Sequence, residues 1–140
     1  MERTYATPLL DKLGVRPDAR VAIIATDDVD IRALLASRTA DVTEGWPLPD
    51  TDLILLGVDA PADLSVLARL RPQLRPAGAI WVVSRKGREA TIRDIEVMAA
   101  ARTAGLVDNK VASFSATHTA LRLVIPLADR PGPASGTIAP

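Results

Sequence analysis

Three short runs of apolar residues constrain the fold of this 140-residue chain more than any other feature. They span residues 20–26, 52–58 and 79–84 and consist mainly of Val, Ile, Leu and Ala. Each run is too short for a core helix and too continuously apolar for a strand with one exposed face. This pattern is typical of strands buried on both faces of a parallel sheet.

Segments with helical spacing alternate with these strands, which indicates crossover connections. We expect helices over residues 7–13, 29–38, from 61 onward and from 91 to about 104, and a short strand over 41–44. Residues 45–50 (GWPLPD) read as a loop, and residues 106–114 and 119–127 read as an antiparallel hairpin. The predicted fold is an α/β, truncated Rossmann-like three-layer sandwich, with a mostly parallel sheet and a C-terminal antiparallel hairpin.

Specific residues indicate where two of these helices begin and which side chains they bury. Pro61 suits a first helical position, and Leu64, Leu67 and Leu70 recur at helical spacing after it. Thr91 with Asp94 resembles a capping box. The helix that it opens is expected to bury Ile92, Ile95, Met98 and Ala99, and Gly105 is expected to end it.

Length and composition bound the class of protein. Residues 1–128 predict a single domain, and residues 129–140, rich in Pro, Gly and Ser, predict a disordered tail. The 17 basic residues balance the 17 acidic ones, which argues against a nucleic-acid or membrane-surface binder. The absence of cysteine excludes disulfides and thiolate chemistry. No apolar run approaches the ~20 residues of a membrane span, so we expect a cytoplasmic protein.

Several phrases of the sequence resemble the class I methyltransferase core. The phrase "LLDKLGVRPDARVAII" is similar to the opening helix, turn and first strand, and "DLILLG" resembles the fourth strand. The phrase "LRPAGAIWVV" resembles the turn into the fifth strand, with Ala77 in place of a glycine. The closing hairpin also matches that superfamily. The resemblance implies its Rossmann-like fold.

A closer resemblance is to a short family of unknown function with methyltransferase-like cores, domain of unknown function 3052. The phrases "TPLLDKLGV" and "GLVDNKV…LRLV", and Trp81 with Lys86, look like its signatures. His118 stands where that family usually has tryptophan, and Arg85 where it often has proline. The family implies no activity. The residues that match its pattern one by one are Lys86, Asp108, Lys110 and Arg122.

The segment after the first strand departs from a methyltransferase. A glycine-rich turn there lets the backbone approach S-adenosylmethionine, but this chain reads "ATDDVDIRALL". Asp27, Asp28 and Asp30 gather at the start of the following helix, where they would repel an anionic cofactor group. We therefore expect no cofactor, and S-adenosylmethionine is disfavoured. Glu44 lies where an acidic residue could grip ribose, or it is simply an exposed loop carboxylate.

The carboxyl ends of the predicted strands define the face where a ligand would bind. His118 could act there as a general base or be a solvated loop histidine. Arg85 and Lys86 could bind an anion or belong to a charged loop. The ligand-binding candidates on this rim are Thr26, Asp27, Asp59, Arg85, Lys86 and His118.

Three charged residues of the hairpin are expected to share one face. Asp108 and Lys110 are two apart in a strand, and Arg122 lies nearly opposite. We interpret them as a structural cross-strand ion cluster, with part of a binding site as the alternative. No residue stands in a recognisable nucleophile motif, and a single histidine makes a zinc site unexpected, so no catalytic or metal-binding residue is predicted.

Two functions are consistent with these observations. The first is a non-catalytic methyltransferase-like domain that binds a partner protein or forms a homo-oligomer, marked by exposed apolar residues around Trp46. The alternative is a protein or enzyme that binds a small anionic molecule on the rim, marked by a pocket near Asp59, Lys86 and His118. An active S-adenosylmethionine-dependent methyltransferase is the third hypothesis. The first hypothesis implies that the protein is not an enzyme.

Overall fold

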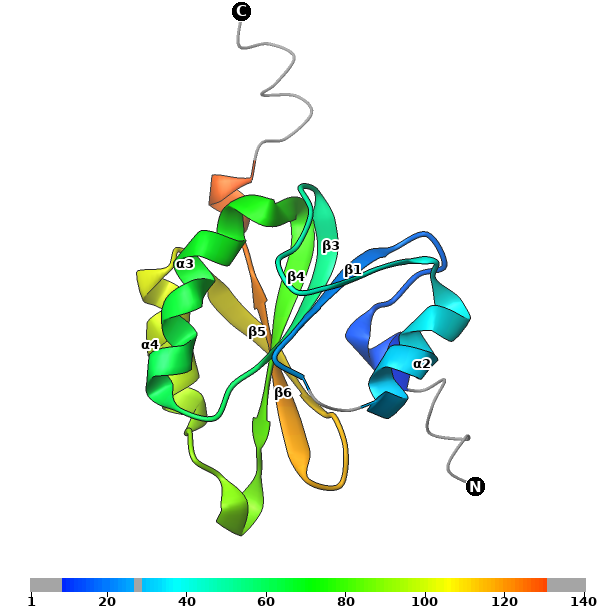
Figure 1. Ribbon diagram of the computed structural model, residues 1–140. Coiled ribbons are helices and arrows are strands. Elements are labelled where there is room, and N and C mark those ends of the chain that lie inside the picture. Colours follow the sequence, from blue (N-terminus) through cyan, green and yellow to red (C-terminus); the bar gives the residue numbers. More distant parts are fainter. Residues whose placement is uncertain (1–8, 27–28, 131–140) are drawn as a thin grey trace, which may run out of the picture.

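The computed structural model describes residues 9–26 and 29–130 (Figure 1). Within them, six strands form one sheet in the order β2-β1-β3-β4-β6-β5. The first four strands are mutually parallel, and β6 runs antiparallel to both β4 and β5. This confirms the predicted mostly parallel α/β sandwich with a C-terminal hairpin. The strands are β1 (Arg20–Ile24), β2 (Asp41–Glu44), β3 (Thr51–Gly57), β4 (Leu74–Arg85), β5 (Val107–Ser113) and β6 (His118–Val124).

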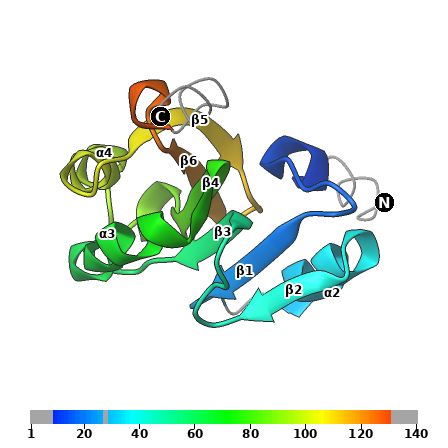
Figure 2. The ribbon, with the colours of Figure 1, turned by 90° about the horizontal axis from the view of Figure 1, so that it is seen from above.

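Helices cover both faces of the sheet and make the three layers (Figures 1 and 2). One face packs against helical residues 9–13 and α2 (Val29–Arg38), and its core includes Leu13, Leu35 and Trp81. The other face packs against α3 (Leu67–Leu70) and α4 (Asp94–Thr103). Alternate residues of the central strands point into the two cores, which explains why the strands are apolar throughout. Gly14 ends the first helical segment with a φ of 79°.

The connection between β3 and β4 is mostly a 3₁₀ helix. The α-helix expected from residue 61 onward is limited to α3, which lies between the 3₁₀ helices η1 (Pro61–Val66) and η2 (Arg71–Gln73). Leu64, Leu67 and Leu70 are all buried, as expected. A spacing of three keeps these leucines on one side of the connection, because residues i and i+3 share a face in a 3₁₀ helix and in an α-helix alike.

Helix α4 begins three residues later than expected, and this changes the face that it buries. Its N-cap is Arg93, whose backbone N–H donates to Glu96 Oε1 at 2.9 Å, so the predicted Thr91 capping box was wrong. Ile95, expected inside, is 65 % exposed, whereas Val97 is buried together with Ala101. The position of the N-cap sets the phase of the helix, and Glu96 reaches the N-cap amide.

Strand β4 is longer than the predicted run. It begins at Leu74 rather than residue 79, and its pairing with β3 shifts register between Thr51 and Leu53. The expected start of the first helix at residue 7, the acidic residues 27 and 28, and most of the expected tail lie outside the described residues. No helix within the described ranges is long and apolar enough to cross a membrane.

Candidate functional site

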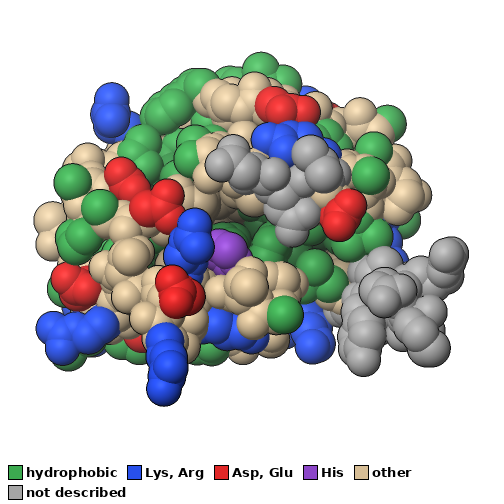
Figure 3. Space-filling model, turned by 60° about the horizontal axis from the view of Figure 1, so that its bottom comes forward, with side chains coloured by type: hydrophobic (Ala, Val, Ile, Leu, Met, Phe, Trp, Pro, Cys, Tyr) green, Lys and Arg blue, Asp and Glu red, His purple; other side chains and the backbone are tan. Residues whose placement is uncertain are grey.

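The carboxyl ends of β1 and β3 meet at a switch point of the sheet. From β1 the chain moves outward to β2, and it then returns to form β3 on the other side of β1. Loops diverge at such a point and leave a crevice, which is where open α/β sheets bind their ligands. A cavity of about 330 Å³ lies there. Figure 3 shows this face, with the histidine in the wall of a hollow.

Four of the six predicted rim residues line this cavity. Thr26 follows β1, Asp59 follows β3, Arg85 ends β4 and His118 begins β6. Parallel pairing aligns the ends of β1, β3 and β4, and the hairpin turn rises beside them. The structure therefore brings together residues that are up to 92 positions apart, from 26 to 118. Ser115 and Thr117 of the hairpin turn also line the cavity, as do Gly57 and Phe114, which the sequence reasoning did not single out.

The other two predicted rim residues are Lys86 and Asp27. Lys86 is absent from the cavity wall; its Nζ donates to Ser113 Oγ at 2.9 Å, and its backbone N–H donates to Thr117 O at 3.0 Å. Both contacts hold the hairpin turn against the end of β4. Asp27 lies outside the described residues, and of its two acidic neighbours only Asp30, in the first turn of α2, is described.

Opposite charges face each other loosely across the cavity. Arg85 Nε lies 3.9 Å from Asp59 Oδ1, and both side chains are more than half exposed. At this distance and exposure the ion pair contributes little to the stability of the fold. Either group can therefore leave the other at little cost. The guanidinium and the carboxylate can therefore both contact a bound molecule.

His118 is held by its own turn. Its Nδ1 lies 2.7 Å from Thr117 Oγ1, and its backbone N–H donates to Ser115 Oγ at 3.1 Å. In the sheet it pairs with Arg85, so the two side chains leave the sheet on one side. The hydroxyl of Thr117 fixes the orientation of the imidazole ring, which leaves Nε2 as the nitrogen for further contacts.

The floor of the crevice depends on Gly57. A Cβ at this position would lie 2.2 Å from Ala25 O and 2.9 Å from Ala25 C. The backbone that leaves β1 thus rests directly on the end of β3. Ala25 itself has a φ of 55°, in the left-handed region that costs a non-glycine residue of order 1 kcal/mol.

Arg32 bridges the ends of β1 and β2, which the sequence reasoning missed. Its Nη2 donates to Thr26 O at 2.8 Å, and its Nε donates to Glu44 Oε1 at 2.9 Å. Glu44, the residue placed to grip a ribose, is therefore paired with an arginine of this chain. Nothing in the sequence distinguishes Arg32 from an exposed helix residue, because the contact depends on where the loop after β1 runs.

The family of the chain follows from a comparison with family models. The model described as "Protein of unknown function (DUF3052)" matches residues 11–127. The chain belongs to this family. The matched range includes every strand of the sheet and all four rim residues of the cavity. No match was found among curated protein sequences.

Methyltransferases are among the solved structures that are similar to the DUF3052 domain. An S-adenosylmethionine-dependent methyltransferase from Aquifex aeolicus superposes with a TM-score of 0.63 and 14 % identity, over 86 % of this chain and 89 % of that one. A precorrin-6y C5,15-methyltransferase from Geobacter metallireducens gives a TM-score of 0.61 and 10 % identity, over 86 % and 88 %. At such identity the likeness shows the fold alone, which is methyltransferase-like.

The predicted ion cluster of the DUF3052 hairpin was wrong. A β-bulge shifts the register between Asp108 and Lys110, so that Asp108 pairs with Leu123 and Lys110 pairs with Arg122. Because neighbours in a strand face opposite sides, the bulge puts Asp108 and Lys110 on different faces. Among the described residues, no ion pair joins these three side chains.

The described part of the domain also holds no group of three His, Asp or Glu side chains placed to bind a metal ion.

Proposed function

We propose that this DUF3052 domain binds a small polar molecule with an anionic group in the cavity at the carboxyl ends of its strands. The observation that carries the proposal is the convergence of Thr26, Asp59, Arg85 and His118 on one cavity at the switch point. A volume of about 330 Å³ is at the lower end of the range for ligand pockets. The proposal therefore concerns a small metabolite.

Each side chain has a part in the proposed recognition. The Arg85 guanidinium can make paired hydrogen bonds to a carboxylate or phosphate. Asp59 and the His118 ring can accept or donate hydrogen bonds to hydroxyl or amino groups of the same molecule. The loose contact between Arg85 and Asp59 supports this assignment, because a ligand can separate them at little cost.

In this proposal, the ligand of the cavity is not S-adenosylmethionine. Residues 15–44 contain no glycine, so the turn after β1 lacks the residue type that admits this cofactor. Beside the cavity, Ala25 packs directly on Gly57, and Arg32 donates hydrogen bonds to Thr26 and Glu44, so protein groups occupy the gaps between β1 and its two neighbours there. The residues present thus fit the cofactor poorly, and we propose no reaction that depends on it.

A thermal-shift screen of the full chain tests this proposal. The probes are hydroxylated organic acids, sugar phosphates, S-adenosylmethionine and S-adenosylhomocysteine. A ligand at 100 times its Kd adds about 2.7 kcal/mol, or roughly 10 °C in Tm for a chain of this size. We expect an anionic metabolite to stabilise the wild type and not Arg85→Gln.

The matched control is Arg69→Gln, which removes the same charge from an exposed position of α3. This variant should respond as the wild type does. Stabilisation that survives in Arg85→Gln, or a shift with S-adenosylmethionine, would overturn the proposal.

A second candidate function is self-association, which the loop after β2 favours. Trp46 is 50 % exposed and Leu48 is 46 % exposed, so two large apolar side chains lie at the surface of one short loop. The loop follows β2, an edge strand of the sheet. Sedimentation velocity of the wild type and of Trp46→Ser tests this function. A dimer that Trp46→Ser dissociates supports it, and a wild-type monomer at high concentration contradicts it.

A further inference from the structure

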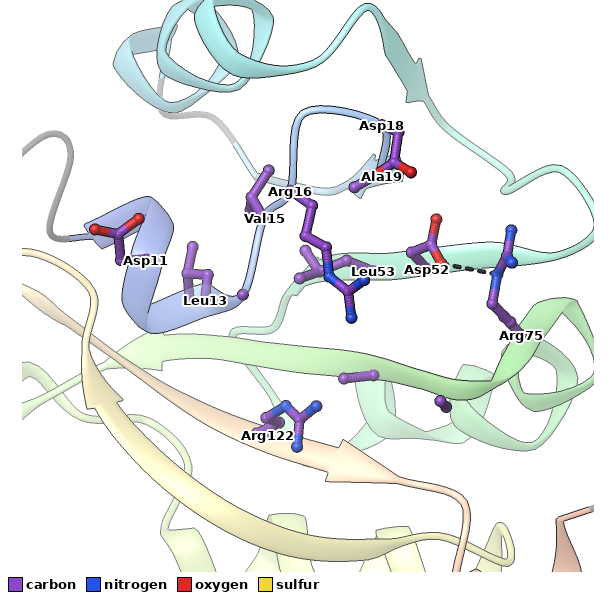
Figure 4. Close-up of a pocket in the computed structure, with 13 residues that line it drawn as sticks. Asp11, Leu13, Val15, Arg16, Asp18, Ala19, Asp52, Leu53, Arg75 and Arg122 are labelled. Carbon is purple, nitrogen blue, oxygen red and sulfur yellow. Dashed lines mark ion pairs between the residues drawn. The ribbon is translucent and has the colours of Figure 1, made fainter.

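A second cleft lies at the opposite, amino-terminal end of the strands (Figure 4). Its volume is about 540 Å³, and it lies between the loop of residues 14–19, the start of β3, and the face of β4 and β6. Arg16 reaches into it from the loop, and Arg122 reaches into it from β6. In the view of Figure 4 the Arg16 side chain extends from the loop toward the sheet, and Arg122 lies on β6, on the other side of β4 from it.

Arg122 is an unusual residue for the face of a sheet that carries a core. It pairs with Trp81 of β4, which is fully buried, and its side chain leaves the sheet on the same side. Its Nη1 lies 3.3 Å from Asn109 Oδ1. Burial first, and the charge of Arg130 second, lower the pKa of Arg122 from its usual value. The fold thus keeps a partly buried cation at this position although the surroundings disfavour its charge.

The carboxylates of the cleft do not neutralise the two arginines. Asp52 pairs with Arg75 at 2.8 Å, and Asp11 pairs with Arg38 at 2.7 Å. Asp18 projects from the loop away from the guanidinium groups in Figure 4. Across residues 9–26 and 29–130, no ion pair involves Arg16 or Arg122.

We propose that Arg16 and Arg122 form a binding site for the phosphate or carboxylate group of a small molecule. A partly buried guanidinium is costly unless a counter-charge and hydrogen bonds satisfy it. Arg16 and Arg122 line the same cleft, and each guanidinium can offer paired donors to the oxygens of an oxyanion bound there. Leu13, Val15 and Leu53 line the same cleft, so an apolar portion of the ligand can lie beside the anionic group.

This site is independent of the function proposed above. It lies at the other end of the strands from the cavity of Arg85 and His118, and the two cavities have no lining residue in common. A molecule bound at one site therefore contacts none of the side chains that line the other. The two proposals can fail separately.

Inorganic phosphate and acetate are the probes for this site. We titrate each into the full chain at constant ionic strength and follow the backbone amides of residues 14–19 and 122, together with the arginine Nε–H groups, by nuclear magnetic resonance. We expect phosphate to shift Arg16 and Arg122 Nε–H with a saturable curve. Stronger binding of phosphate than of acetate assigns the site to phosphate esters, and the reverse order assigns it to carboxylates.

Three variants decide the result. Arg16→Gln, on an exposed loop residue that the core does not need, is expected to weaken binding about tenfold or more, because it removes a charge-assisted contact. Arg69→Gln and Arg85→Gln are expected to leave the phosphate-induced shifts of the Arg16 and Arg122 Nε–H groups as they are in the wild type. The proposal is overturned if neither anion shifts the Arg16 and Arg122 Nε–H groups with saturation, if Arg16→Gln leaves the Arg122 shift unchanged, or if Arg85→Gln removes these shifts while Arg16→Gln does not.

Discussion

Replacing Gly57 with alanine tests how the crevice is built. The new Cβ would lie 2.2 Å from Ala25 O, whereas ordinary contacts begin near 3.4 Å, so the backbone after β1 must move by about 1 Å. Overpacking of this kind costs typically 1–3 kcal/mol. The φ of Gly57 lies outside the left-handed region, so backbone strain contributes no further cost. We expect Gly57→Ala to lower the free energy of unfolding by about 1–3 kcal/mol.

Urea unfolding followed by circular dichroism measures this loss, and Gly87→Ala is the control. Gly87 has a φ of 70° and open space around its Cα, so its replacement costs only the left-handed strain of about 1 kcal/mol. Amide shifts should spread to Ala25 and Thr26 in Gly57→Ala but not in the control. Wild-type stability of Gly57→Ala, with unshifted Ala25 and Thr26 amides, would refute the close approach of the two backbones.

Three further substitutions have definite expected outcomes. Trp81→Phe removes the 3.0 Å hydrogen bond from Trp81 Nε1 to Leu13 O and should cost about 1–3 kcal/mol in urea unfolding, whereas Trp46→Phe should change stability by less than about 0.5 kcal/mol. The lowered pKa of Arg122 means that the fold disfavours its charge at every pH below that pKa. Arg122→Met should therefore leave the free energy of unfolding in urea unchanged, or raise it by up to about 1 kcal/mol, across the neutral range. A clear loss of stability would contradict this. Arg32→Gln should lower stability by no more than about 1 kcal/mol, since its carboxylate partner is largely exposed, and a larger loss in thermal unfolding would show that the bridge holds the sheet together.

The strands and the rim could be predicted because both follow from local patterns. Apolar runs buried on two faces identify the parallel strands, and the residue after each run must lie at the carboxyl edge. This rule alone is enough to predict that Thr26, Asp59 and Arg85 lie close together. The position of His118 follows from the predicted antiparallel hairpin, whose turn lies at the same edge of the sheet.

Other features depend on tertiary contacts that leave no local pattern. The bulge that separates Asp108 from Lys110 inserts one residue, and no turn or glycine signal in the sequence marks it. The cleft of Arg16 and Arg122 joins segments that are remote in the chain, and the bridge of Arg32 depends on how β1, α2 and β2 pack together. The exposure of Ile95 depends on a shift of two residues in the N-cap of its helix, from Thr91 to Arg93, and helix ends are the part of a helix that sequence patterns fix least.

The most direct test of the ligand-binding account is an amide titration of the wild-type domain with two kinds of probe. One is a panel of malate, citrate and glycerol phosphate, and the other is S-adenosylhomocysteine. The account predicts that at least one small anion shifts the amides of Gly57, Ser115 and His118 with saturation, and that S-adenosylhomocysteine shifts none of them. Saturable shifts of Ala25 and Thr26 with S-adenosylhomocysteine, and none with the small anions, would contradict it.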